Sequence, residues 1–165
     1  MSIFRPILAR VGGINGYLAQ TNLSPFLVAT CQTPDASAGN WTAASWDVFT
    51  VTGEVYVHAA FAVVDEALTG ASTLAFGVSG TTGCLIASTT AAATNLDAVN
   101  DVWIGRSTAS YARYNGEVDG GGVILSDCSV ELTVSAASVT NGQLTFYILY
   151  TPISSDGLVE ADTWA

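Results

Sequence analysis

The sequence predicts an all-β protein, an antiparallel β-sandwich of jelly-roll type with an extended N-terminal arm. Apolar residues occupy every second position from 128 to 136, with polar residues between them through Ser135, as in a strand with one buried face. Similar short runs recur at intervals of about 8–15 residues, a spacing typical of sandwiches and barrels. Asn141-Gly142 accepts the positive φ angles of a type I′ turn, so residues 128–150 are predicted to form an antiparallel hairpin.

The composition is that of one domain with extensive apolar surface. Half of the 165 residues are hydrophobic and 11% are charged, against about 25% charged in ordinary soluble proteins. No stretch approaches the roughly 20 apolar residues of a membrane helix, so no membrane partner is expected. Arg10 and Gly12-Gly13 interrupt the apolar N-terminal segment, which excludes a secretion signal and indicates synthesis in a reducing cytoplasm.

The charge distribution is acidic and uneven. Residues 1–34 carry two arginines and no acid, whereas residues 35–165 carry all 14 acids and the other two arginines, for net charges of +2 and −12. A net charge of −10 without any lysine argues against nucleic acid as a partner. The two N-terminal arginines are enough to tether their segment to an acidic neighbour.

Residues 1–25 are predicted to be an arm that leaves the sandwich and docks on a neighbouring copy or another protein. Glycines and prolines interrupt its short apolar pieces, which favours an extended course. So many apolar residues cannot all stay exposed. The residues expected at the arm interface are Phe4, Arg5, Ile7, Leu8 and Arg10.

The body, residues 26–165, is predicted to be a single sandwich domain. It begins with a strand over 26–30, and Gly53 separates a strand over 48–52 from one over 54–64. Strict alternation in the latter predicts one shared face, made of Val55, Val57, Ala59, Phe61 and Val63. A turn over 65–70 follows.

The second half of the body continues the pattern. Leu74, Phe76 and Val78 line the next strand, and further strands are expected over 84–88, 102–104, 111–114 and 123–125. Residues 91–99 are the one stretch that could hold a helical turn. The hairpin over 128–150 completes the body.

No catalytic constellation is found, and we expect neither an enzyme nor a cofactor. The single histidine, His58, has no nucleophile or acid partner at motif spacing, which favours a structural or interface role. The pairs of neighbouring acidic residues fall in expected turns. A glycosidase that uses such a pair remains an alternative. A calcium site at Asp97 with Asp101, or at the Asp119 loop, is a further alternative. An odd cysteine count indicates free thiols at Cys31, Cys84 and Cys128.

Four aromatic residues are candidates for the surface: Trp41, Trp46, Tyr111 and Tyr114. Exposed aromatic rings can stack on sugars, and they are also favoured in protein interfaces. Core packing is the third interpretation of the tryptophans. The sequence leaves these alternatives open.

The C-terminal stretch 141–157 combines a hydrophobic strand, Pro152 and a turn over 154–157. In these features it resembles the end of small head proteins of tailed bacteriophages, and the Ala, Thr, Gly and Val-rich middle resembles capsid decoration (cement) proteins. The resemblance implies a structural virion protein on the capsid surface, which binds the major capsid protein as a homotrimer and stabilises the head. The alternative function is a carbohydrate- or receptor-binding module of a phage tail or fibre.

Overall fold

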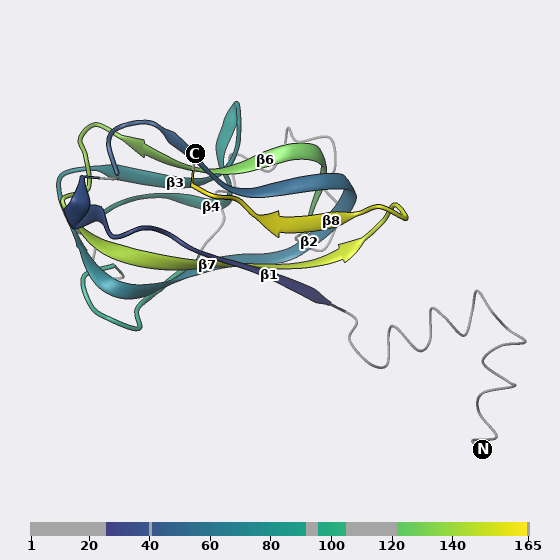
Figure 1. Ribbon diagram of the computed structural model, residues 1–165, viewed down its shortest axis with the longest axis horizontal. Coiled ribbons are helices and arrows are strands. Elements are labelled where there is room, and N and C mark those ends of the chain that lie inside the picture. Colours follow the sequence, from purple (N-terminus) through teal and green to yellow (C-terminus); the bar gives the residue numbers. More distant parts are fainter. Residues whose placement is uncertain (1–25, 40, 92–95, 105–121, 165) are drawn as a thin grey trace, which may run out of the picture.

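A computed structural model describes residues 26–39, 41–91, 96–104 and 122–164 (Figure 1). Within these ranges nearly all regular structure is β-strand, and the sole helical element is one short 3-10 turn, η1 (Ala36–Ala38). All strand pairs are antiparallel, which confirms the predicted all-β sandwich-like fold. The strands are β1 (Leu27–Gln32), β2 (Ser45–Thr69), β3 (Thr73–Val78), β4 (Thr81–Thr90), β5 (Val102–Trp103), β6 (Val123–Ser135), β7 (Asn141–Pro152) and β8 (Leu158–Ala161).

The long strand β2 connects the two layers of the molecule. The strand order is β1-β7-β2-β6-β3-β4, with β5 and β8 also paired to β2. The first part of β2 pairs with β6 and β8, and its later part pairs with β7 and β5. In Figure 1, β3, β4 and β6 therefore lie in one layer and β1 and β7 in the other.

A bulge at Gly53 lets β2 pass from one layer to the other. The strand register with β6 shifts between Val51 and Glu54, and Gly53 has φ of 63°. Its amide donates to Asp127 Oδ1 at 2.8 Å. The break between strands that the sequence predicts at Gly53 is thus a bend inside one strand of 25 residues. The same strand extends to Thr69, where the sequence predicts a turn over 65–70.

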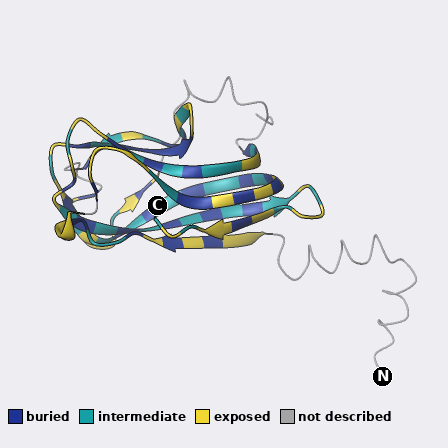
Figure 2. Cartoon of the chain, turned by 45° about the horizontal axis from the view of Figure 1, so that its top comes forward, coloured by how far each residue is buried: buried dark blue, intermediate teal, exposed yellow. Residues whose placement is uncertain are grey.

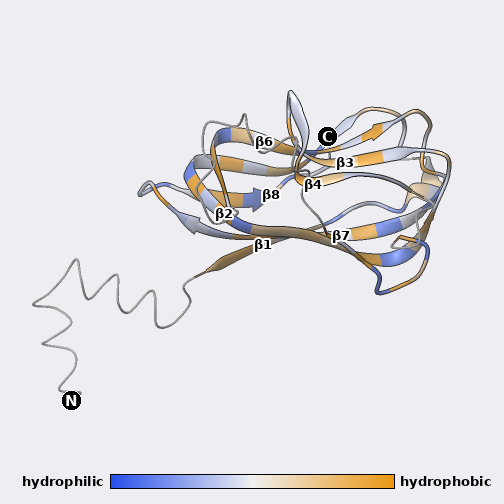
Figure 3. Cartoon of the chain, turned by 180° about the vertical axis from the view of Figure 1, so that it is seen from behind, coloured by the Kyte–Doolittle hydropathy of each residue, from blue (hydrophilic) through white to orange (hydrophobic). Residues whose placement is uncertain are grey.

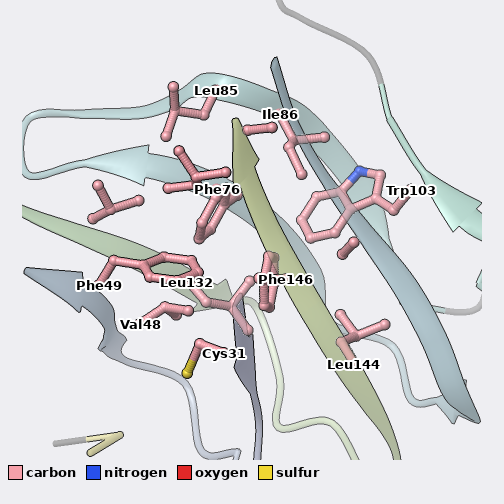
Figure 4. Packing of buried hydrophobic residues seen from close by; sticks show 14 of the residues in the cluster. Cys31, Val48, Phe49, Phe76, Leu85, Ile86, Trp103, Leu132, Leu144 and Phe146 are labelled. Carbon is pink, nitrogen blue, oxygen red and sulfur yellow. The ribbon is translucent and has the colours of Figure 1, made fainter. Parts of the chain in front are cut away.

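The core lies between the layers and is built largely from aromatic rings. Phe76 of β3 stacks on Phe146 of β7 with ring centroids 4.4 Å apart, so this contact joins the two layers (Figure 4). Phe49 and Trp103 pack edge-on against the same pair. Along β7, and along stretches of β2 and β6, buried residues alternate with more exposed ones (Figure 2), as expected for one-sided burial.

The predicted hairpin over residues 128–150 is wrong. β6 pairs with β2 and β3, whereas β7 pairs with β1 and β2, so residues 136–140 cross between layers. Asn141 Nδ2 instead donates to Glu66 Oε1 and to the Ala67 carbonyl, at 3.1 and 3.3 Å. Gly142, with φ of 117°, packs against Leu68 at the end of β2. The one hairpin between consecutive described strands joins β3 and β4.

The predicted shared face of residues 55–63 is also wrong, because a second bulge changes the phase of β2. The register with β7 shifts between Val57 and Ala59. Before it, Val55 and Val57 are buried; after it, Ala60, Ala62 and Val64 are buried. Ala59, Phe61 and Val63 are partly exposed on the outer side of the layer.

The remaining sequence expectations on strands fall into two groups. Strands occur as expected around 26–30, 74–78, 84–88 and 102–104, and 123–125 begins β6. Described residues 96–100 form turns instead of a helix. The strand expected over 111–114 lies outside the described residues.

Candidate interaction surface

The outer side of the β1–β7–β2–β5 layer carries a continuous set of apolar and aromatic side chains. We call this surface the outer face. Figure 3 shows hydrophobic residues at the start of β1, where the chain enters the layer. Its apolar and aromatic members are Phe26 just before β1, Val28 on β1, Tyr147 and Leu149 on β7, Tyr56, Ala59, Phe61 and Val63 on β2, and Val102 on β5.

The strand register aligns these residues in rows across the layer. Leu149 lies opposite Val28 on one side and Ala59 on the other. In the next row, Tyr147 lies opposite Phe61, and their rings stack with centroids 4.9 Å apart. Such cross-strand pairs hold side chains in a fixed pattern. The outer face is therefore a preformed surface.

Exposure on this face is high for apolar residues. Val28 is 57% exposed, Phe26 42% and Val102 45%, and Ile104, which follows β5, is 63% exposed. The bulge at residues 57–59 sends Ala60 and Ala62 inward and the larger Phe61 and Val63 outward. Contiguous exposed apolar patches of this kind mark interaction sites.

His58 lies at one end of the outer face, between two aromatic rings. The ring centroids of Phe26 and Tyr56 are each 4.5 Å from that of His58, both in edge-on geometry. His58 Nε2 is 2.8 Å from Thr151 Oγ1 on β7. These contacts fix the imidazole against the surface and link three strands, which fits the structural or interface role expected from the sequence.

The carboxylate of Asp65 lies at the other end of the described part of the outer face, next to Glu66, which pairs with Gln143 of β7. Asp65 Oδ2 accepts hydrogen bonds from Thr145 Oγ1 at 2.6 Å and Gln32 Nε2 at 3.1 Å. The described body has no cationic Arg or Lys side chain, because all four arginines fall outside it. All 14 acids except Glu117 and Asp119 lie within it.

Three tryptophans pack together away from this face. Trp164 stacks on Trp46 at 5.7 Å and lies 5.3 Å from Trp41, measured between ring centroids. Trp41 is fully buried, and its Nε1 donates to the Pro34 carbonyl at 2.9 Å. Trp41 is thus a core residue, which corrects its assignment as a surface aromatic; Trp46 is partly buried. Tyr111 and Tyr114 lie outside the described residues.

A hollow of about 510 Å³ adjoins Trp164 and is lined by Gln32, Pro34, Asp162, Thr163 and Trp164. Hydrogen bonds from Thr50 Oγ1 at 2.6 Å and from the Thr163 amide at 2.7 Å lower the pKa of Asp162, because they favour its charged form. The hollow thus combines an ionised carboxylate with an amide, a hydroxyl and an indole. Sequence reasoning missed this group, because Asp162 and Gln32 are distant in the chain.

The three cysteines are free thiols, as predicted; Cys31 and Cys84 are buried, and burial raises the pKa of both. Within the described ranges, no group of three His, Cys, Asp or Glu residues is placed to hold a metal ion. Asp101 Oδ2 accepts instead from the Ala98 amide, and Asp119 lies outside the described residues. No described helix is long and apolar enough to cross a membrane.

The residues expected at the arm interface, which are Phe4, Arg5, Ile7, Leu8 and Arg10, lie outside the described residues. The sequence does not predict the outer face, since strict alternation places Phe61 and Val63 on one face with Val55 and Val57. Comparison with family models, with curated proteins and with solved structures finds no match for this chain.

Proposed function

We propose that this chain is a structural virion subunit, a capsid decoration protein of a tailed phage that assembles as a homo-oligomer, a trimer, on the outer shell. The observation that carries the proposal is the outer face. An enzyme needs converging reactive groups, whereas this surface presents Phe61, Tyr147, Leu149 and Val28 in fixed rows. The resemblance of residues 141–157 to small phage head proteins supports the same class.

The chemistry of the outer face is that of an interface centre. Aromatic residues are enriched and charged residues depleted at the centre of protein interfaces. Here Phe61 stacks on Tyr147, and the two central rows, Val28–Leu149–Ala59 and Thr30–Tyr147–Phe61, contain no charged residue. Contact between copies through this face is therefore the proposed basis of the oligomer.

The acidic remainder of the body is proposed to contact the shell. Exposed carboxylates such as Glu54, Asp127 and Glu160 have no described arginine or lysine to pair with. A basic shell surface would complement them and guide binding. Each oligomer then bridges adjacent capsid subunits and opposes their separation under internal DNA pressure. In this proposal the activity is mechanical, and it involves no catalysis, cofactor, nucleic acid or membrane.

The decisive experiment measures self-association and capsid binding of the purified protein. Light scattering should give a defined oligomer, and the oligomer should co-sediment with mature capsids that lack it. Phe61→Ser should weaken self-association by more than about tenfold, as for a central apolar anchor. Leu158→Ser is the matched control, since Leu158 is 40% exposed on β8, away from the outer face. A monomer that ignores capsids would overturn the proposal.

The hollow beside Trp164 favours a second candidate function, a carbohydrate- or receptor-binding module of a tail or fibre. Asp162, Gln32 and Thr163 can hydrogen-bond hydroxyl groups, and the indole of Trp164 offers an apolar surface. Glycan-array binding that is lost in Asp162→Ala and retained in Phe61→Ser would support this function. Absence of binding to any glycan would exclude sugar recognition at this hollow.

A further inference from the structure

We infer that residues 1–25 of one copy dock on the outer face of a neighbouring copy. This inference rests on the homo-oligomeric assembly proposed above and names the segment that covers the face. It is argued from the chemistry of the face, the composition of the segment, and the point at which the segment joins the body.

The segment joins the body directly at the outer face. Residue 25 precedes Phe26, whose ring packs 4.5 Å from His58 at one end of the rows. The outer face extends along β1 from Phe26, which precedes the strand, to Gln32, a distance of about 20 Å at strand spacing. Twenty-five residues can span about 80 Å when extended. Their length therefore exceeds what one face needs and suffices to reach a second body.

The segment has the side chains that the face would accept. It contains the apolar pairs Ile3-Phe4 and Ile7-Leu8, separated by Arg5-Pro6. The face presents the apolar side chains of Val28 and Leu149 and the stacked rings of Phe61 and Tyr147. Removing about 25 cal/mol per Å² of apolar surface from water favours their contact.

Charge favours this segment over direct contact between two bodies. The described bodies are strongly acidic, so two bodies brought into direct contact would repel each other. Residues 1–25 contain no acid and include Arg5 and Arg10. Asp65, at the far end of the rows, offers a carboxylate that is held in place by Gln32 and Thr145. An arm placed between the bodies thus supplies the positive charge that the described body lacks.

The test uses full-length chains in which either the arm or the face is altered. Ile7→Asp places a charge in the arm, and Phe61→Asp places one on the face; Leu158→Asp is the control. Each of the first two variants alone should lose more than about tenfold in self-association, and the control should retain it. Mixed together, Ile7→Asp and Phe61→Asp chains should form a 1:1 pair, because the second donates an intact arm to the intact face of the first.

A cross-linking measurement identifies the donor copy independently. A photoreactive residue in place of Phe4, in a mixture of ¹⁴N- and ¹⁵N-labelled chains, should yield mixed-isotope peptides that join the arm to β2 or β7. Should Phe61→Asp unfold, Val28→Asp replaces it, because Val28 is 57% exposed.

The outcomes separate this inference from the proposed function. If the unaltered chain is monomeric, the proposed assembly fails and the inference fails with it. If the oligomer forms but survives Ile7→Asp, the inference alone is overturned. Cross-links confined to one chain, or no pairing in the mixture, would place the arm on its own body and also overturn it.

Discussion

Gly142 illustrates how one residue carries a different role from the one its local sequence indicates. Asn141-Gly142 is the usual signature of a two-residue turn, yet here both residues fasten the start of β7 to the end of β2. A Cβ atom at Gly142 would lie 2.4 Å from Leu68 Cδ2, 2.8 Å from Leu68 Cα and 2.9 Å from the Ala67 carbonyl oxygen. The residue is therefore required by close packing between strands distant in the chain.

We predict that Gly142→Ala lowers the free energy of unfolding by about 1–3 kcal/mol, through backbone strain and steric overlap. Gly80→Ala is the matched control. Its φ of 81° is also positive, but an added Cβ would meet nothing within 4 Å. Chemical denaturation of both variants measures the difference. Equal losses would mean that φ alone decides the cost.

The exposed carboxylates predict how stability depends on pH. Hydrogen bonds lower the pKa of Asp162 through Thr50 and Thr163, of Asp35 through Ser37, and of Asp156 through Ser154. A pKa lower in the folded chain than in the unfolded one, near 3.9 for Asp, stabilises the fold above that value. This contribution is lost as the pH falls through the folded pKa.

We therefore expect the free energy of unfolding to fall when the pH is lowered from about 7 to below about 4. Thr50→Val removes the strongest contribution to the Asp162 shift and should make this decline shallower. Thr52→Val is a control on the same strand. Denaturation at several pH values tests the expectation, which a steeper decline in Thr50→Val would contradict.

At the scale of the elements, β2 determines both the architecture and the outer face. Its bulge at Gly53 lets one strand serve two layers, and its bulge at residues 57–59 reverses which residues point inward. Ala62 is fully buried and its neighbour Val63 is partly exposed.

The inward position of Ala62 and the outward position of Val63 can be tested by enlarging each side chain. Ala62→Leu should destabilise the fold by about 1–3 kcal/mol because it overfills the core. Val63→Leu should change stability by less than about 0.5 kcal/mol. Thermal or chemical unfolding distinguishes the two. A larger loss of stability in Val63→Leu than in Ala62→Leu would instead support the strict alternation predicted from the sequence.

The same strand explains what the sequence could and could not predict. Alternation located most strands, since burial on one face leaves a period of two whatever the partner strand is. It could not locate the bulge near His58, where one extra residue shifts the phase without any local signal. The sequence wrongly pairs β6 with β7, because the choice of partner strand depends on residues distant in the chain, such as Leu68. Because the bulge is missed, the sequence places Phe61 and Val63 on one face with Val55 and Val57, and it does not indicate the outer face.

At the scale of the whole molecule, the central contacts of the core are made by residues of the described body. These contacts, Phe76 with Phe146 and with Phe49, join β2, β3 and β7. The edge strand β1 is held to β7 through six register pairs from Leu27 to Gln32. The energy of folding is therefore expected to come from the body, and the energy of assembly from the arm together with the outer face.

Deletion of residues 2–20 should consequently leave a folded monomer that assembles poorly. Far-ultraviolet circular dichroism of the truncated chain should remain that of a β-protein, with a thermal midpoint close to that of the unassembled full-length chain. Self-association should weaken by at least about tenfold relative to the full-length chain. This difference should be smaller at high salt, since screening reduces both the repulsion between acidic bodies and the attraction of Arg5 and Arg10. If the truncated monomer unfolds instead, the segment contributes to the core, and the separation of folding from assembly along this chain is wrong.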